Sequence, residues 1–383
     1  MASLYCLGNY MSKKIVHIII GLNIGGAELM LKRLVLHSQK KGNFHHEVIS
    51  LTDLGLIGKD LKEAGIRVYT LNMSSVLSTF SIYFSLKKLL NEIKPDIVQT
   101  WMYHADFLGG LAAKSLGIQK IVWGIRTTDV TQGASRLTIG LRKICAKLSY
   151  SVPTDIVCAA HVSKDVHIKI GYDASKIHVI PNGFELDKLV ATEEDRNKIR
   201  QEFNIPRDAI VIGSVGRFNV VKNQKFFVEV ARELVKTDSN LIFMLVGRDN
   251  TADNNELMGW LGEYHLINNF RLLGQRDDIP RCLKAMDIFC LHSKTEGFPN
   301  VLGEAMAVGT LVTALDVGDS KYLLNNEKFI AQDKMKILSI LEDILSSIKD
   351  FSEVITENKE RILKEFPLSR IVILYEEIYL KGM

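Results

Sequence analysis

The chain has 383 residues, which is too long for one hydrophobic core of ordinary size, so two domains are expected. Hydrophobic residues make up 47% of it and charged residues 24%, a composition that excludes a disordered or fibrous protein and indicates a soluble, globular one. The formal net charge is +4, but basic residues outnumber acidic ones in residues 1–190 and the reverse holds in the rest. The first half is therefore expected to meet an anionic partner.

The anionic partner that best fits this charge pattern is a membrane surface or a lipid that carries a pyrophosphate. A nucleic-acid partner is not expected, because the basic residues form no stripe interleaved with aromatic ones and no nucleic-acid-binding motif is present. A generally solvated basic surface is the alternative.

The five cysteines include no C-x-x-C pair, which argues against a disulfide framework or a zinc site and favours a reducing cytoplasm. No apolar run reaches membrane-spanning length. The first residues, MASLYCLGNYMSKK, do not resemble a signal peptide, and both Met1 and Met11 are possible starts.

The first half alternates apolar strands with amphipathic helices. Continuous apolar runs such as KIVHIII are typical of parallel strands that are buried on both faces. We expect strands at 14–20, 46–51, 68–71, 96–100, 121–124 and 156–159, and helices at 28–40, 82–93, 105–116 and 136–149. This alternation predicts a doubly wound sheet.

The composition changes between residues 180 and 208, where a turn-rich stretch precedes a highly charged helix, so we place a linker near 181–189. A second alternation follows, with strands at 209–215, 241–246, 270–273, 288–291 and 311–314 and a helical tail from 333. The pattern predicts an α/β fold with two Rossmann-like domains, residues 1–185 and 186–365. Ligands are expected in a cleft at the carboxyl ends of both sheets.

The most informative segment is DIFCLHSKTEGFPNVLGEAMAVGTLVTALDVG, residues 287–318. It predicts a strand, a loop that carries Glu296 and Phe298, a helix that opens at Pro299, and a closing Gly309. Backbone N–H groups in the first turn of that helix suit a phosphate or a sugar hydroxyl. Those groups belong to Asn300, Val301 and Leu302. Glu304 lies among small apolar residues, so we expect its carboxylate to face a ligand; a salt bridge at a domain edge is the alternative.

This segment resembles the signature of the retaining, nucleotide-sugar-dependent glycosyltransferases of family 4, which have the two-domain GT-B fold. The resemblance implies that the last helix, within residues 366–383, crosses back to the first domain. It also implies that Glu304 binds the ribose of the donor and that Glu296 positions the transferred sugar. The chain departs from the pattern by lacking a proline after Gly309 and a glutamate after DVGD, which affects the expected donor preference.

A second motif, IGSVGRFNVVKNQ, follows the strand at 209–215 and places two cations beyond the end of that strand. Cations at this position can stabilise the charge that develops on a departing nucleoside diphosphate. Gly216, Arg217 and Lys222 match the diphosphate-binding pattern of the family, so no metal ion or other cofactor is expected. A pair of ordinary surface cations is the alternative.

The remaining candidates follow other predicted strands. Gly25 and Gly26 form a glycine loop without the dinucleotide fingerprint G-x-G-x-x-G, and a tight turn explains them equally well. His104 follows the strand at 96–100, and the resemblance implies that it contacts the transferred sugar. Arg126 is a candidate for the diphosphate or the acceptor. The resemblance further implies that the loops at Gly247 and Arg276 hold the base and a phosphate, largely through backbone groups.

These features predict a cytoplasmic enzyme, peripheral on the inner face of an anionic membrane. The expected reaction transfers a sugar from a nucleotide donor, a UDP-sugar, to a glycan or polyprenyl-linked glycan acceptor in the synthesis of bacterial surface polysaccharide. The alternatives are an epimerase or phosphorylase of the same fold, and a catalytically silent protein that binds sugar nucleotides.

Overall fold

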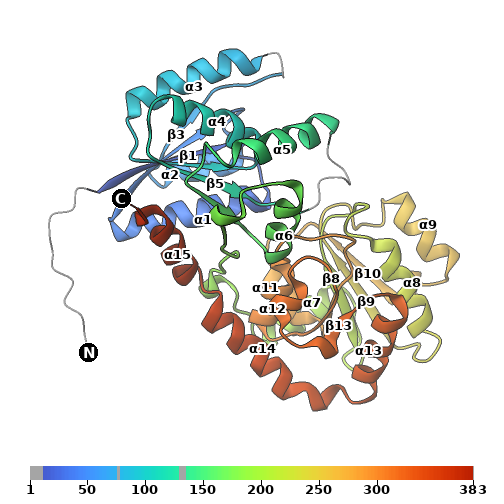
Figure 1. The fold of residues 1–383 in the computed structure, drawn as a ribbon. Coiled ribbons are helices and arrows are strands. Elements are labelled where there is room, and N and C mark those ends of the chain that lie inside the picture. The colour runs from blue at the N-terminus through green and yellow to red at the C-terminus, as the bar shows by residue number, and fades with distance from the viewer. Residues whose placement is uncertain (1–11, 76–77, 129–134, 383) are drawn as a thin grey trace, which may run out of the picture. The chain divides into compact units, whose positions relative to one another are not determined.

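The computed structural model describes residues 12–75, 78–128 and 135–382, which divide into two compact units (Figure 1). The N-terminal unit runs to Gly183 and also contains residues 368–383, and the C-terminal unit spans Phe184–Pro367. The choice between Met1 and Met11 as the start falls outside the described residues. No helix in the described part of the chain is both long and apolar enough to cross a membrane.

The described residues of the N-terminal unit form a seven-stranded parallel sheet with the strand order β3-β2-β1-β4-β5-β6-β7. The central strands β4 and β5 are buried along their whole length, and β1, which was predicted from its apolar run, is buried from Ile15 onward. The strands are β1 (Lys13–Ile19), β2 (Phe44–Ser50), β3 (Arg67–Thr70), β4 (Ile97–Trp101), β5 (Lys120–Ile125), β6 (Asp155–Cys158) and β7 (Ile177–Val179).

Helices cover both faces of this sheet, and each face has its own hydrophobic core. One core contains side chains of α3 (Thr79–Ile93), α4 (Tyr103–Ser115) and α5 (Arg136–Leu148). The other core contains side chains of α1 (Gly26–Lys41), α2 (Gly55–Glu63) and the C-terminal helix α15 (Leu368–Leu380). The helix α6 (His161–Ile170) connects β6 to the last strand. Figure 1 shows α15 beside α1, so the chain's last helix belongs to the N-terminal unit, as predicted.

The C-terminal unit is built on a six-stranded parallel sheet with the order β10-β9-β8-β11-β12-β13. Its strands are β8 (Val211–Val215), β9 (Ile242–Val246), β10 (Phe270–Gly274), β11 (Ile288–Leu291), β12 (Leu311–Leu315) and β13 (Ile330–Ala331). Its helices are α7 (Glu193–Glu202), α8 (Gln224–Leu234), α9 (Asn255–Glu263), α10 (Ile279–Ala285), α11 (Asn300–Val308), α12 (Ser320–Leu324), α13 (Lys334–Ser346) and α14 (Ser352–Glu365).

The structure differs from the sequence prediction mainly at short elements and helix starts. The strands β7 and β13 were not predicted, because three and two residues are too few to show a periodic pattern. The helices α1 and α4 each begin two residues earlier than predicted, since glycine and aromatic residues in a first turn give no apolar stripe. As a result, His104 lies inside the first turn of α4.

The strand orders identify where each sheet can bind a ligand. In the N-terminal unit the order reverses between β1 and β4, and in the C-terminal unit it reverses between β8 and β11. In doubly wound sheets the loops at the carboxyl ends of two such strands diverge and leave a crevice for a ligand. The two loops at each reversal are therefore the place to examine for a functional site.

Candidate active site

In the C-terminal unit the loops after β8 and β11 meet at the reversal point and are hydrogen-bonded to each other. The backbone N–H of Lys294 donates to the carbonyl of Val221 at 2.8 Å, and the side-chain amide of Asn223 donates to the carbonyl of His292 at 3.3 Å. These bonds hold two segments together that are about seventy residues apart in the sequence.

The charged groups of this site are Lys222, Glu296 and Arg217. Lys222 Nζ lies 2.5 Å from Glu296 Oε1, and the two side chains are 27% and 14% exposed. The loop that carries Lys222 is shaped by Asn219, whose side-chain oxygen accepts from the Lys222 backbone N–H at 2.7 Å. Arg217 is exposed, and its guanidinium makes no ion pair or hydrogen bond with any residue that the structure describes. The site thus pairs one cation and leaves the other available to an anionic ligand.

Two glycines allow the neighbouring loops to approach this pair closely. Gly247 has a φ of 131°, and a Cβ there would lie 2.4 Å from the carbonyl oxygen of Gly216. Gly318 has a φ of 57°, and a Cβ there would lie 2.3 Å from the carbonyl oxygen of Gly297. Both positions therefore require glycine.

Asn250 is a site residue that the sequence did not reveal. It is fully buried, and its side-chain nitrogen donates to the carbonyls of Gly216 at 2.7 Å and Gly247 at 3.2 Å. It therefore holds the loop of Gly216 and Arg217 against the end of β9. The only sequence signal was a polar residue shortly after a strand-ending glycine.

The helix α11 begins after the Glu296 loop, as predicted, and ends at Gly309, which has a φ of 85°. Of its first three backbone N–H groups, that of Leu302 already donates to the carbonyl of Pro299 at 3.1 Å. The prediction that Leu302 offers a backbone donor is therefore corrected, because a tight first turn closes on the proline. Glu304 is partly exposed, although its neighbours on either side are buried.

Two aromatic groups beside the site are packed into the core of the C-terminal unit. Phe298 is buried against Phe184 and Phe366, with ring centroids 6.1 and 5.8 Å away, so only its backbone is open to a ligand. His292 is buried and stacks on Phe227 at 4.8 Å. Burial lowers the pKa of His292 to about 4, so this imidazole is neutral at pH 7.

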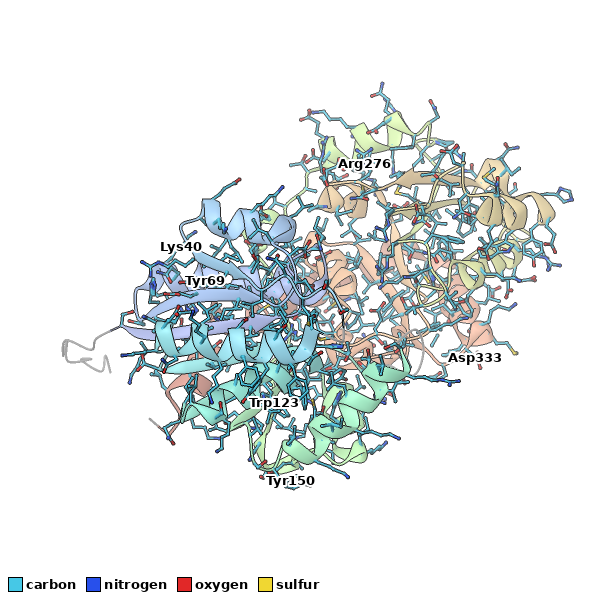
Figure 2. All side chains as sticks on the ribbon, turned by 90° about the horizontal axis from the view of Figure 1, so that it is seen from above. Lys40, Tyr69, Trp123, Tyr150, Arg276 and Asp333 are labelled. Carbon is cyan, nitrogen blue, oxygen red and sulfur yellow. The ribbon has the colours of Figure 1, made fainter. Side chains whose placement is uncertain are left out.

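Arg276, predicted to bind the donor, is engaged by carboxylates. Its guanidinium contacts Glu202 Oε1 at 2.6 Å and Asp278 Oδ1 at 2.7 Å, and hydrogen bonds to both groups raise the Arg276 pKa above its ordinary value. The guanidinium also lies over the ring of Phe203. Its side chain, labelled in Figure 2, thus ties α7 to the start of α10, and at this position only the backbone remains for a ligand.

In the N-terminal unit, Gly25 and Gly26 lie at the reversal between β1 and β4, where α1 begins. A Cβ at Gly25 would lie 2.3 Å from Oε2 of Glu28, so the glycine leaves space for that carboxylate. Burial raises the pKa of Glu28. Glu28 is a second residue at a ligand-binding edge that the sequence did not single out.

His104 lies at the other side of this reversal, in the first turn of α4, and burial lowers its pKa. It is therefore a neutral imidazole at pH 7, able to donate or accept a hydrogen bond but not to act as a cation. Met102, two residues before His104, has a φ of 73° and a ψ of 159°, a backbone conformation that is nearly reserved for glycine. Such backbone strain is concentrated at functional sites.

Arg126 follows β5, but its guanidinium is held by groups of the same unit. It donates to the hydroxyl of Tyr375 at 2.9 Å and to the side-chain oxygen of Asn182, and it lies over the ring of Trp101. These contacts connect the end of β5 to α15 and to Asn182, which lies next to the unit boundary at Gly183. The structure thus gives Arg126 a structural contact that the sequence did not predict.

The C-terminal site can bind an anionic group through Arg217, Lys222 and the start of α11, in a loop frame that glycines and Asn250 hold in place. Fixed cations of this kind stabilise negative charge that develops on a leaving group. Among the described residues, no group of three His, Cys, Asp or Glu side chains could hold a metal ion.

Comparisons with known proteins agree with this arrangement. Residues 195–362 match the family described as Glycosyl transferases group 1, and residues 24–188 match Glycosyltransferase Family 4. The chain is 28% identical over 256 residues to the UDP-Gal:alpha-D-GlcNAc-diphosphoundecaprenol alpha-1,3-galactosyltransferase of Escherichia coli, a match that covers 66% of each chain. It is 27% identical over 268 residues to the N,N'-diacetylbacillosaminyl-diphospho-undecaprenol alpha-1,3-N-acetylgalactosaminyltransferase of Campylobacter jejuni, covering 67% of this chain and 69% of that one.

Solved structures share the fold over almost the whole chain. HepE of Anabaena, solved in complex with UDP, superposes with a TM-score of 0.83 at 20% identity and covers 95% of this chain and 98% of its own. WaaG, a glycosyltransferase involved in lipopolysaccharide biosynthesis, superposes with a TM-score of 0.71 at 14% identity, covering 96% of this chain and 100% of its own. With both of its halves matched by the two family descriptions, the chain belongs to the family 4 glycosyltransferases and has the GT-B fold.

Proposed function

We propose that this glycosyltransferase transfers a sugar, with retention of anomeric configuration, from a UDP-sugar to a lipid-linked glycan acceptor. The observation that carries the donor side is the pairing of Lys222 with Glu296 beside the exposed guanidinium of Arg217 at the reversal between β8 and β11. A nucleotide sugar has its diphosphate next to its transferred sugar, and this site places cations next to a carboxylate.

The residues of the C-terminal unit then have separate roles. Arg217 and Lys222 stabilise the departing diphosphate, and the backbone N–H groups at the start of α11 contribute further donors. Glu296 accepts hydrogen bonds from hydroxyls of the transferred sugar, while it holds Lys222 in place. Glu304, one turn further along the same helix, accepts from the ribose.

In the N-terminal unit, the neutral imidazole of His104 and the loop of Gly25 and Gly26 position the transferred sugar and the acceptor hydroxyl. The bond from the anomeric carbon to the diphosphate breaks, the bond to the acceptor oxygen forms on the same face, and the leaving phosphate takes the acceptor's proton. The charge that leaves with the diphosphate is balanced by side chains, so the reaction needs no metal ion.

The nature of the acceptor is supported by the relatives from Escherichia coli and Campylobacter jejuni, whose names specify undecaprenol diphosphate-linked acceptors. An acceptor of this kind is anchored in a membrane. We therefore place the enzyme in the cytoplasm, peripheral on the inner face of an anionic membrane, in a pathway of surface polysaccharide synthesis.

The test is acceptor-dependent release of nucleoside diphosphate. The purified chain is incubated with UDP-glucose, UDP-galactose and their N-acetyl forms, with and without a short-chain polyprenyl diphosphate-linked sugar, and the product linkage is read by NMR. We expect UDP release only with acceptor, an α-linked product, and the same rate in EDTA.

Other outcomes would contradict parts of the proposal. Conversion of the donor without acceptor would indicate an epimerase, and binding without turnover would indicate a silent sugar-nucleotide-binding protein. A β-linked product would exclude retention, and loss of the rate in EDTA with recovery on adding magnesium or manganese would exclude metal-independent transfer.

A further inference from the structure

One face of the N-terminal unit combines exposed aromatic and aliphatic side chains with unbalanced positive charge. The helices α3, α4 and α5 pack side by side on one face of the sheet, where they share one hydrophobic core (Figure 1). Their outer surfaces therefore all point away from that side of the sheet. We call this outer surface the α3–α5 face.

The apolar part of the face lies on the two outer helices. Phe80 and Phe84 are one helical turn apart on α3, and they are 80% and 63% exposed. Leu137 and Ile144 are two turns apart on α5, and they are 66% and 48% exposed. Tyr150, just beyond α5, is labelled at the rim of the unit in Figure 2 and is also exposed. Phe80 and Phe84 are neighbours on the surface of one helix, and contiguous exposed apolar side chains of this kind mark interaction surfaces.

The charges of the same three helices are almost all positive. Among their described residues, the acidic side chains are Asp106, which is fully buried, and Glu92, at the end of α3. The exposed or partly exposed basic side chains on these helices are Lys87, Lys88, Lys114, Arg136, Lys143 and Lys147. On the opposite face of the sheet, two cations of α1 pair with carboxylates, Lys32 with Asp60 at 2.6 Å and Lys41 with Glu376 at 3.2 Å. The helices α2 and α15 of that face also carry Glu63 and Glu377.

From this pattern we infer that the α3–α5 face docks on a membrane whose surface carries anionic lipid. Aromatic side chains flanked by lysine and arginine insert at the boundary between head groups and acyl chains, while the cations bind the anionic head groups. A soluble acidic protein would pair with the cations but would leave Phe80 and Phe84 without an apolar partner. The inference rests on the proposed function in one respect, since a lipid-linked acceptor requires the enzyme at the membrane.

The experiment measures binding of the full-length chain to vesicles of phosphatidylcholine with and without phosphatidylglycerol. We expect binding to anionic vesicles that weakens as ionic strength rises above about 0.15 M, because salt screens exposed charges. The double variants Phe80→Ser/Phe84→Ser and Lys143→Glu/Lys147→Glu should each raise the lipid concentration for half-maximal binding by about tenfold or more.

Matched control variants carry the same kinds of change on the opposite face of the sheet. They are Ile373→Ser/Leu380→Ser, which changes two exposed apolar residues of α15, and Lys40→Glu/Lys59→Glu, which reverses two exposed lysines of α1 and α2. Both controls should bind like the wild type. Melting temperatures confirm that each variant folds, and if the phenylalanine variant fails to fold, the lysine pair still tests the face.

The results separate this inference from the proposed activity. Transfer to a short, water-soluble acceptor should be unchanged in all four variants, whereas transfer to an acceptor embedded in anionic vesicles should fall only in the two α3–α5 variants. Vesicle binding without any sugar transfer would contradict the proposed function but would still support membrane docking by the α3–α5 face. Equal vesicle binding by all variants would overturn the inference that the α3–α5 face docks on a membrane. The same conclusion would follow if light scattering showed that the protein is a dimer and that the α3–α5 substitutions dissociate it.

Discussion

Arg217 and Glu304 both belong to the C-terminal unit, but the proposed chemistry requires different things of them. In the proposed mechanism Arg217 acts on charge that develops as the glycosidic bond breaks, whereas Glu304 would bind ribose hydroxyls equally well in the ground and transition states. Only the first kind of interaction raises kcat. Arg217→Ala should therefore lower kcat by about 10²- to 10³-fold, the usual cost of losing one such donor.

Glu304→Gln should mainly raise the KM for the donor, because the amide keeps the shape but accepts more weakly. Steady-state constants at saturating acceptor, together with melting curves, separate these effects. If both variants only melted at lower temperature with no split between kcat and KM, the two residues would hold the fold and nothing more.

Met102 provides a prediction about backbone strain. Its φ of 73° and ψ of 159° cost a non-glycine residue about 1–3 kcal/mol, while glycine costs the folded state about 0.5–1 kcal/mol in entropy. Met102→Gly should therefore be more stable than Met102→Ala, the reverse of the usual order. Chemical denaturation of the two variants measures the difference. An alanine variant that is the more stable of the two would show that this turn relaxes without strain.

At the scale of elements, both hydrogen bonds and apolar packing attach the C-terminal helix α15 to the N-terminal unit. The hydroxyl of Tyr379 donates to Gln99 Oε1 at 2.5 Å, and Ser38 donates to Glu376 Oε1 at 2.8 Å. Apolar residues of the same helix, such as Val372 and Tyr375, are fully buried in the core on that face. A C-terminal helix of the chain thus completes the core of the first unit.

Changes at Tyr379 should separate these two contributions. Tyr379→Phe leaves the buried oxygen of Gln99 without its donor and should lower the free energy of unfolding by about 1–3 kcal/mol. Tyr379→Ala also leaves a cavity and should cost about 3–5 kcal/mol. Leu380→Ala, on the exposed side of the same helix, should change it by no more than about 0.5 kcal/mol. Urea denaturation gives the three values, and equal losses for all three would mean that α15 is not part of this core.

For the whole molecule, buried neutral histidines make stability depend on pH. Burial lowers the pKa of His46 to about 3 and the pKa values of His167 and His292 to about 4. In the unfolded chain each imidazole takes up a proton below pH about 6.5. Between about pH 6.5 and 4 the unfolded state therefore binds more protons than the folded one, so stability rises with pH across this window and falls on acidification.

Each of these histidines contributes a slope of up to about 1.4 kcal/mol per pH unit in that window. Denaturation at pH 7.5 and pH 5 should show a loss of several kcal/mol in the wild type, and a shallower pH dependence in His167→Asn, which cannot titrate. A stability that does not change from pH 7.5 to pH 5 would mean that these imidazoles are already open to water in the folded protein.

Local patterns predicted much of this molecule. The apolar runs of β1 and β11 identified buried parallel strands, because strands that are buried on both faces are typically rich in apolar residues. The loop from Glu296 to the end of α11 followed from a proline that opens a helix and a glycine that closes it. Short elements such as β13 were missed, since two residues carry no period.

Contacts between distant segments decided the rest. Strand order set the reversal points, and with them the pairing of Lys222 with Glu296, which are 74 residues apart. The sequence presents Arg126, Arg217 and Arg276 alike as cations after strands, but tertiary packing gives Arg126 and Arg276 hydrogen-bond partners in the protein and leaves Arg217 exposed. The physical reason is that hydropathy and turn propensity act over a few neighbouring residues, whereas the partner of a charge depends on which strands become neighbours in the sheet.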